Sequence, residues 1–304
     1  MEPSEQTTGA APAWQVLPTR DAELGEGMTI RRALPTRGRR MIGAWCFLDH
    51  FGPVDVATGE GMRVGPHPHT GLQTFTWPLA GELFHRDSLG CQQLIRPGAV
   101  NLMTAGRGIS HSEESPPEHV PTLHGAQLWI ALPEAQRHIE PAFEHYPAMP
   151  VVERGGFRVT VLAGESLGEQ APTRVYSPLV GLDLAAPGDA ALVLPLRPDF
   201  EYGALVLAGE ARLAGGALVP GQLLYLGRGR ESLEVSGAAG LRLLLLGGAP
   251  FGEDVLMWWN FVGRTREELA EYVSAWNAGD PRFGTVRGYA GDRLPAPRPP
   301  WAAA

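Results

Sequence analysis

The chain has 304 residues and a mass of 32.6 kDa, with 44% hydrophobic and 19% charged residues, a composition typical of a globular protein that excludes a wholly disordered chain. The net charge of −8 argues against direct nucleic-acid binding, and the absence of Lys among the 25 basic residues excludes lysine nucleophiles, Schiff-base lysines and P-loops. Cys46 and Cys91 are too few for a disulfide framework or a Cys-built zinc site, and no apolar run forms a secretory leader or approaches the ~20 residues of a membrane span, so we expect a cytoplasmic protein.

In chain order, the predicted elements are mostly short strands. Residues 1–13, rich in Ala, Thr, Glu and Pro, are predicted to form a loose N-terminal tail. The 39 Gly and 28 Pro separate short apolar stretches, which is the pattern of many strands joined by tight turns. The clearest of these predicted strands cover residues 72–78, 92–95, 100–103, 128–132, 158–162, 204–207, 222–226 and 241–246.

One helix is clearly predicted, near the C-terminus. Thr265 can cap it with Glu268 at the third helical position, and Asn277-Ala278-Gly279 would end it. Between them, apolar residues recur at helical spacing: Leu269, Tyr272, Val273 and Trp276. The Pro- and Ala-rich residues 293–304 are predicted to form a second loose tail. We therefore expect an all-β protein with a few short helices.

A weak internal repeat indicates two successive barrels. The first half has Trp77–Glu82 (WPLAGE) and then Arg96–Val100 (RPGAV), and the second half has Leu205–Glu210 (LVLAGE) and then Val219–Leu223 (VPGQL). Each pair reads as a strand, a Gly turn, another strand and a Pro-Gly turn into a third strand. Chance recurrence of common turn dipeptides is the alternative explanation. The predicted division places a first barrel at 14–150 and a second barrel, with the helix, at 151–292.

Two pairs of potential metal ligands lie among the histidines. His67-Pro68-His69 and His111-Ser112-Glu113 each place two donors two residues apart, so on a strand both would point to the same face. Ordinary core or surface histidines are the alternative for an isolated His-x-His, but two pairs in a β-rich chain favour a metal site. Three imidazoles and one carboxylate suit Fe(II), Mn(II), Ni(II), Cu(II) or Zn(II), and Cys-free ligation with open positions favours iron or a similar redox-active ion.

Several motifs around these residues resemble those of the pirin family. Gly65–Thr74 (GPHPHTGLQT) looks like the first cupin motif in the form that pirins use. Further segments that are similar to pirins are His85–Gly90 (HRDSLG), Met103–Glu113 (MTAGRGISHSE), Leu128–Pro133 (LWIALP) and Trp259–Arg264 (WNFVGR). The resemblance runs from about Arg31 to about Pro297, nearly the whole chain.

This resemblance implies two tandem jelly-roll-like cupin barrels, of which the N-terminal one holds a metal and the C-terminal one is degenerate. The family's ligands correspond here to His67, His69, His111 and Glu113. Fe(II) is the favoured metal, with Mn, Ni, Cu, Co and Zn as alternatives. Gln73 departs from the general cupin pattern, in which Glu is common at this position, and we expect it to lie beside the ligands and tune them.

Weaker candidates are expected to have structural roles. His85 and Asp87 are also two residues apart but lack a partner pair, so we expect them to be structural or to support the ligands from behind. The string Gly164–Gly168 (GESLG) matches a nucleophile elbow, but no helical pattern and no later His follow it, so it is predicted to be a loop. Arg107 is expected to tie down its turn. Solvated or core positions are expected for His119, His124, His138 and His145, and core positions for Trp77, Trp129, Trp258 and Trp259.

Two functions of different classes follow from the resemblance. The first is an Fe(II)-dependent dioxygenase of the quercetin (flavonol) 2,3-dioxygenase type, acting on a small, flavonol-like aromatic substrate and O2, in which Glu113 takes the substrate proton. The alternative is an iron-dependent redox-sensing regulator that acts through protein–protein interaction. A sugar-isomerase-like or storage cupin is a weaker third hypothesis. An open cavity that reaches the metal would favour the enzyme. We expect a monomer that binds neither nucleic acid nor membranes directly.

Overall fold

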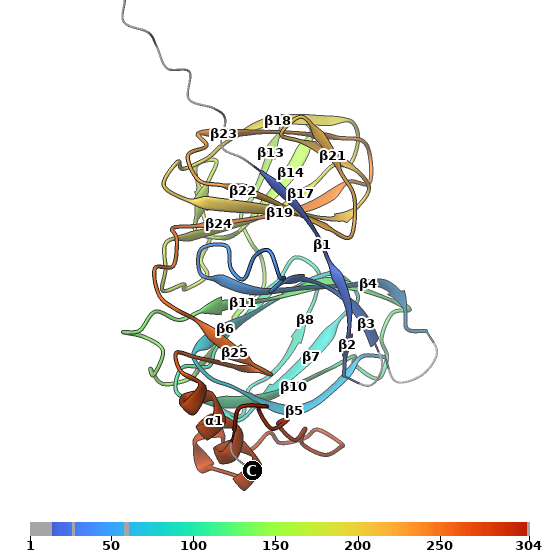
Figure 1. The fold of residues 1–304 in the computed structure, drawn as a ribbon. Coiled ribbons are helices and arrows are strands. Elements are labelled where there is room, and N and C mark those ends of the chain that lie inside the picture. Colours follow the sequence, from blue (N-terminus) through green and yellow to red (C-terminus); the bar gives the residue numbers. More distant parts are fainter. Residues whose placement is uncertain (1–13, 26–27, 58–60, 303–304) are drawn as a thin grey trace, which may run out of the picture.

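The computed structural model describes residues 14–25, 28–57 and 61–302, which form two stacked β-barrels (Figure 1). The first barrel combines a seven-stranded sheet of order β12-β9-β6-β11-β4-β3-β2 with a four-stranded sheet of order β5-β10-β7-β8. Its strands are β2 (Arg20–Leu24), β3 (Met28–Leu34), β4 (Trp45–Asp55), β5 (Arg63–His69), β6 (Leu72–Ala80), β7 (Leu83–Asp87), β8 (Gln92–Ile95), β9 (Val100–Thr104), β10 (Ile109–Glu114), β11 (Thr122–Ala131) and β12 (Ala142–Tyr146).

The second barrel repeats this topology strand for strand. Its sheets have the orders β1-β22-β19-β24-β17-β14-β13 and β18-β23-β20-β21, so that β17 to β24 take the places of β4 to β11. Its strands are β1 (Gln15–Pro18), β13 (Val151–Arg154), β14 (Phe157–Ala163), β17 (Leu179–Ala185), β18 (Ala190–Pro195), β19 (Glu201–Ala208), β20 (Ala211–Leu213), β21 (Gly216–Leu218), β22 (Gln222–Gly227), β23 (Ser232–Gly237) and β24 (Arg242–Gly248). The expected tandem duplication and all-β class are thus confirmed.

The N-terminal strand crosses from one barrel to the other. β1 precedes the first barrel in sequence, but it pairs with β22 in the register Gln15↔Tyr225 to Pro18↔Gln222. It occupies the edge of the second barrel's large sheet that β12 occupies in the first. The prediction that all of residues 14–150 belong to the first barrel is therefore wrong at this end, because β1 covers an otherwise open sheet edge.

One hydrophobic core spans both barrels. The buried residues of the seven-stranded sheets pack together between the barrels, including Trp45 and Trp77 from the first and the leucines of β17, β19 and β24 from the second. The Trp45 indole N–H points at the carbonyls of Val180 and Gly247, at 3.2 and 3.3 Å. The Trp77 indole donates to the buried carboxylate of Asp183. These contacts satisfy the polar atoms of large aromatic side chains that the interface buries.

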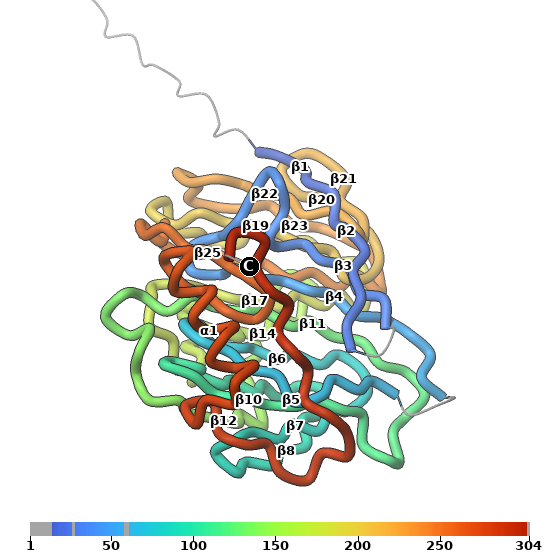
Figure 2. The backbone as a smooth tube through the Cα atoms, turned by 60° about the horizontal axis from the view of Figure 1, so that its bottom comes forward, coloured from blue at the N-terminus to red at the C-terminus, as the bar shows by residue number. Residues whose placement is uncertain are grey.

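The chain returns to the first barrel after β24. This C-terminal segment contains the hairpin β25 (Leu256–Trp258) and β26 (Phe261–Gly263), the helix α1 (Arg266–Ala278) and a 3-10 turn (Pro281–Phe283). It lies over β5 and β10 (Figure 2), where Phe261 forms a parallel bridge with Thr70. The sequence groups this helix with the second barrel, but in the structure it belongs to the segment that packs on the first. No helix in the described residues is long and apolar enough to cross a membrane.

The local signals of α1 agree with the prediction. Thr265 caps it by accepting the backbone N–H of Glu268, Gly279 ends it in the left-handed conformation, and the predicted apolar positions are the buried ones. The expected loose tail at 293–304 is corrected for its described part. Leu294 N–H donates to the Pro66 carbonyl (2.8 Å), and Ala296 exchanges two hydrogen bonds with the Asn277 side chain. The predicted tail at 1–13 lies outside the described residues.

Two further elements complete the description. The short strands β15 (Glu165–Ser166) and β16 (Glu169–Gln170) form a hairpin around the GESLG string. Because no helix follows Ser166, the hairpin provides no nucleophile elbow, as expected.

Candidate metal centre and its pocket

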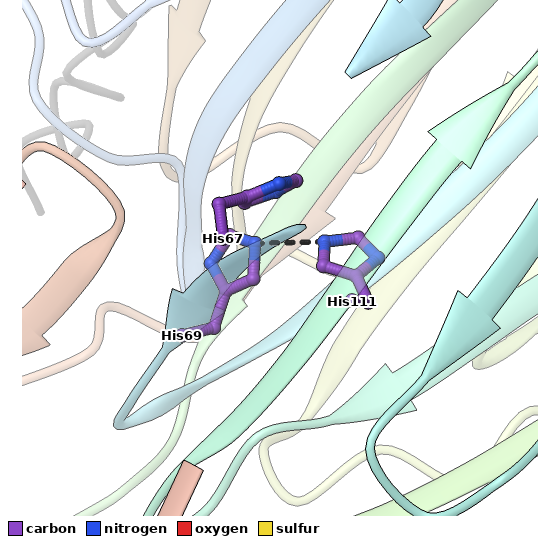
Figure 3. Close-up of side chains that lie close together, drawn as sticks. All are labelled: His67, His69 and His111. Atoms are coloured by element: carbon purple, nitrogen blue, oxygen red, sulfur yellow. Dashed lines mark hydrogen bonds between the residues drawn. The ribbon is translucent and has the colours of Figure 1, made fainter. Parts of the chain in front are cut away.

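Three predicted ligands converge inside the first barrel. β5 and β10 are antiparallel neighbours in which His67 lies opposite His111. The three imidazoles face one another (Figure 3), with 3.0 Å between the Nε2 atoms of His69 and His111 and 4.3 Å between the ring centroids of His67 and His111. One nitrogen from each ring lies within 4.8 Å of the others.

Hydrogen bonds behind two of the rings fix which nitrogen faces the centre. His67 Nδ1 lies 2.9 Å from the Gly65 carbonyl, and His69 Nδ1 lies 3.0 Å from the Asn260 carbonyl. A carbonyl oxygen only accepts, so each Nδ1 carries a proton in the neutral ring and each Nε2 keeps its lone pair. This is the arrangement of metal-binding histidines, whose other ring nitrogen donates to a carbonyl or carboxylate.

Burial keeps these rings neutral. Burial lowers the pKa of His67 to about 4, and it holds the pKa values of His69 and His111 well below the ordinary range, assisted by the neighbouring imidazoles. Neutral imidazole is the form that binds metals. Three buried, unprotonated nitrogens directed at one point therefore fit a divalent transition metal.

Glu113 lies beside this group rather than within it. Its ligand oxygen forms a second close group with His85 and His111, within 4.8 Å, and not with His67 and His69. Between His111 and Glu113 the register of β5 and β10 shifts, because β5 has an extra residue at this point. Glu113 Oε1 accepts a hydrogen bond from Thr76 (3.3 Å), and burial raises the pKa of its carboxyl group.

A cavity of about 270 Å³ reaches the three histidines. Phe47 and Trp129 stack in its wall with ring centroids 3.9 Å apart, and Arg32 lies over Phe47 while bonding both oxygens of Asp49 (2.8 and 2.7 Å). Burial raises the pKa of Asp49, and the hydrogen bonds from Arg32 oppose that shift. The site thus combines a flat aromatic wall with a paired charge.

Some residues of this wall come from distant parts of the chain. Trp259 and Asn260, in the loop between β25 and β26, line the cavity together with Leu294. The core position predicted for Trp129 is confirmed, since it is buried in a cluster with Phe47, and it lines the cavity as well. Trp259, predicted to be in the core, is only partly buried. No sequence motif marks Phe47, Arg32 or Asp49 as site residues. Trp129 and Phe47 become candidate site residues only because they lie opposite each other on β11 and β4. Nothing in the sequence near either residue predicts this pairing.

Other predicted residues lie away from the centre. Gln73 is buried on the opposite face of β6, where its amide donates to Thr104 Oγ1 and to the Arg174 carbonyl, both at 2.9 Å. The expectation that it tunes the ligands is therefore wrong, because alternation along the strand directs it toward the second barrel. Arg107 pairs with Glu140 on the surface, which agrees with a role in its turn.

The remaining histidines join no close group of three candidate ligands among the described residues. His119 bonds the carbonyls of Pro116 and Val56, His145 bonds Asn101, and His138 is exposed. His124 lies 2.8 Å from His50, Nε2 to Nε2. None of them reaches the metal centre.

The second barrel has a cavity of its own, but not the chemistry. Inward positions of β18 and β23, which correspond to β5 and β10, carry apolar side chains: Leu192, Leu194, Leu233 and Val235. The cavity of this barrel, about 510 Å³, is lined mostly by apolar residues, of which Leu194 is one, and by no histidine. The second barrel therefore provides no equivalent metal site.

Comparisons with known proteins agree with this architecture. Residues 27–130 match the Pirin family and residues 181–284 match the Pirin C-terminal cupin domain. The chain is 54% identical to a Pseudomonas aeruginosa protein provisionally named quercetin 2,3-dioxygenase, over 94% of this chain and 91% of that one. It is 36% identical to a pirin-like protein of Caulobacter vibrioides, over 87% and 93% of the two chains.

A solved structure gives the same assignment. The crystal structure of quercetin 2,3-dioxygenase from Acinetobacter baumannii is 51% identical, with a TM-score of 0.93 over 96% of this chain and 97% of that one. The similarity covers both barrels and the segment that returns to the first. The chain therefore belongs to the pirin family.

Proposed function

We propose that this protein is a metal-dependent dioxygenase of the quercetin (flavonol) 2,3-dioxygenase type. The observation that carries the proposal is the cavity that opens onto the three buried Nε2 atoms, because a sensor needs no such access while an enzyme does. The names of the relatives from Pseudomonas aeruginosa and Acinetobacter baumannii support the same reaction class.

The metal would be held by His67, His69 and His111, with Glu113 as the fourth ligand. Fe(II) is favoured for this nitrogen and oxygen donor set, with Mn, Ni, Cu, Co and Zn as alternatives. When bound, it would acidify a coordinated substrate hydroxyl and hold substrate and O2 side by side. The carbonyls of Gly65 and Asn260 keep two of the rings in the required orientation.

The chain's own groups would bind and deprotonate the substrate. Phe47 and Trp129 offer apolar aromatic surface to the ring system of a substrate, and Trp259 lines the same cavity. Glu113 is the one carboxylate in the proposed ligand set, and we assign to it the proton of the substrate hydroxyl. The apolar walls exclude water from the reacting atoms. Every group comes from one chain, so the proposal requires neither a partner protein nor nucleic acid, and a monomer suffices.

Oxygen uptake tests the proposal. Protein reconstituted with Fe(II) and supplied with a flavonol should consume O2, and a His67→Ala/His69→Ala variant should bind little metal and consume none. A His138→Ala variant, altered at an exposed histidine, should behave like the wild type. Protein that holds its metal but consumes no O2 would contradict the proposal and favour the redox-sensing regulator.

The role of Glu113 needs a separate measurement. A Glu113→Gln variant that loses its metal would show only that the carboxylate is a ligand. A variant that retains metal and turns over at a tenth of the wild-type rate or less would support the assigned role as base, since general bases typically contribute 10²–10⁴-fold. Retained metal with normal turnover would contradict that role.

A further inference from the structure

A row of polar side chains continues behind the third histidine, on the side away from the other two. His85 and Asp87 lie on β7, which pairs with β10 so that His111 is opposite Asp87 and Glu113 is opposite His85. His111 Nδ1 lies 3.4 Å from His85 Nδ1, and His85 Nε2 lies 3.1 Å from Asp87 Oδ2. Both residues of the row are buried, at 3% and 2% exposure.

The hydrogen-bonding groups around Asp87 set the direction of the whole row. Asp87 Oδ1 accepts the backbone N–H groups of Leu89 (2.9 Å) and Cys91 (3.0 Å), which leaves Oδ2 as an acceptor for His85 Nε2–H. With its proton on Nε2, His85 presents a lone pair from Nδ1. That lone pair can only accept the Nδ1–H of His111, so the Nε2 of His111 is left unprotonated and faces the metal centre.

The row therefore gives His111 the tautomer that carbonyl oxygens give His67 and His69. The His85 ring is held in place by Phe143, which stacks on it at 4.4 Å between centroids and 17° between planes. All three ligand rings are thus prepared by groups on this chain. Outer partners of this kind orient ligand histidines and raise their basicity.

A second metal is the alternative use of the same side chains, because His85, His111 and Glu113 also form a close group. The charge of the nearby side chains argues against a second metal ion. One divalent ion is balanced by the two nearby buried carboxylates, Glu113 and Asp87, whereas two ions would leave excess positive charge in a buried site. A second ion would also need the Nδ1 of His111 as a ligand, but this nitrogen carries the proton that it donates to His85.

We propose that His85 and Asp87 are positioning residues that fix the tautomer of His111 and thereby the affinity of the first barrel for a single divalent metal. This inference rests on the metal site proposed above. Its sharpest perturbation is Asp87→Asn. An amide nitrogen at the Oδ2 position donates to His85 Nε2, moves the His85 proton to Nδ1, and leaves His111 with its N–H aimed at the metal.

The expected effect is a 10–100-fold loss of metal affinity in Asp87→Asn, the range typical when such outer partners are altered. His85→Gln is the conservative rescue, because its amide oxygen can accept from His111 while its amide nitrogen donates to Asp87. We expect this variant to bind metal within about threefold of the wild type. His85→Leu removes the acceptor and should bind at least tenfold more weakly than His85→Gln.

The test uses Co(II) as probe on the full chain, with affinity from chelator competition, stoichiometry from elemental analysis and geometry from the d–d absorption spectrum. Circular dichroism of the metal-free proteins checks folding. If Asp87→Asn does not fold, the comparison of His85→Leu with His85→Gln decides in its place. The wild type should bind one equivalent, and the weakened variants should show an altered spectrum.

The outcomes separate the two proposals. A wild type that binds no divalent metal would overturn the proposed function itself. A wild type that binds Co(II) while Asp87→Asn, or His85→Leu relative to His85→Gln, keeps the same affinity and spectrum would overturn only the positioning role. Two equivalents in the wild type, one of them lost in His85→Gln, would establish the second metal instead.

Discussion

Trp259 has an unusual backbone conformation for its residue type. It is the first of the two residues that join β25 to β26, and its φ of 53° lies in the left-handed region, which favours Gly. Such a conformation costs a non-Gly residue about 1–2 kcal/mol and is often found at functional sites. Here it places an indole in the wall of the cavity above the metal centre.

Two variants separate the backbone cost from the side-chain contribution. Trp259→Gly and Trp259→Ala both remove the indole and its edge-to-face contact with Phe261 (5.9 Å, 67°), which is worth about 0.5–1.5 kcal/mol. Only Gly also removes the backbone strain, because it adopts a positive φ without steric cost whereas Ala does not. We therefore predict that Trp259→Gly has a free energy of unfolding about 1 kcal/mol higher than Trp259→Ala, although Ala is ordinarily the more stabilising residue of the two.

Substrate binding should change in a different way. If the indole contacts the flavonol, both variants lose one aromatic contact of about 1 kcal/mol, so KM should rise about fivefold in both, with little change in kcat. Urea unfolding and steady-state oxygen uptake measure the two effects. An Ala variant as stable as the Gly variant would refute the strain argument. A wild-type KM in both variants would show that the indole of Trp259 does not contact the substrate.

Two further predictions concern stability. Gly71 has a φ of 68°, and a Cβ there would lie 2.4 Å from the Val262 carbonyl oxygen, so Gly71→Ala should lower the free energy of unfolding in urea by at least about 2 kcal/mol. Gly98 has a φ of 91° with open space around it, so Gly98→Ala should lower it by only about 1 kcal/mol. Equal losses in the two variants would contradict the steric argument. Burial, with the neighbouring His124, lowers the pKa of His50 to about 3. Between pH 6.5 and pH 5 the imidazole of this residue is therefore protonated only in the unfolded chain, and the folded state loses about 1.6 kcal/mol of stability. A His50→Gln variant should therefore lose less stability than the wild type over that range, and parallel curves would contradict the assignment.

Local signals were sufficient for much of the fold. Short apolar runs between Gly and Pro predicted strands such as β8, found at Gln92–Ile95, and β6, found two residues longer than expected. The helix was predicted from its cap and its periodicity, both of which are properties of neighbouring residues. The pairing of β1 with β22 of the second barrel was not predictable in this way. The contact of Gln15 with Tyr225 depends on a sheet edge that exists only after the second barrel has folded.

The candidate site was predictable to the extent that it depends on alternation along strands. His67 and His69 share a face of β5. In the same way, His111 and Glu113 share a face of β10, and His85 and Asp87 share a face of β7. Glu113 shares the face of His111 and lines the same cavity, but its carboxylate forms its close group with His85 and His111 rather than with His67 and His69. Two-residue spacing alone reveals neither this nor the register shift between β5 and β10 at this point. The pocket wall was missed because the loop around Trp259 reaches it from the far end of the chain.

The ratio of carbon monoxide released to O2 consumed tests the central claim most directly. Cleavage of a flavonol by incorporation of one O2 expels one carbon as carbon monoxide, whereas simple oxidation of the flavonol consumes O2 without releasing any. The proposed function predicts that the Fe(II)-loaded wild type releases one carbon monoxide for each O2 consumed. The His67→Ala/His69→Ala variant should neither consume O2 nor release carbon monoxide. Oxygen uptake without carbon monoxide, or equal release by the double variant, would contradict it.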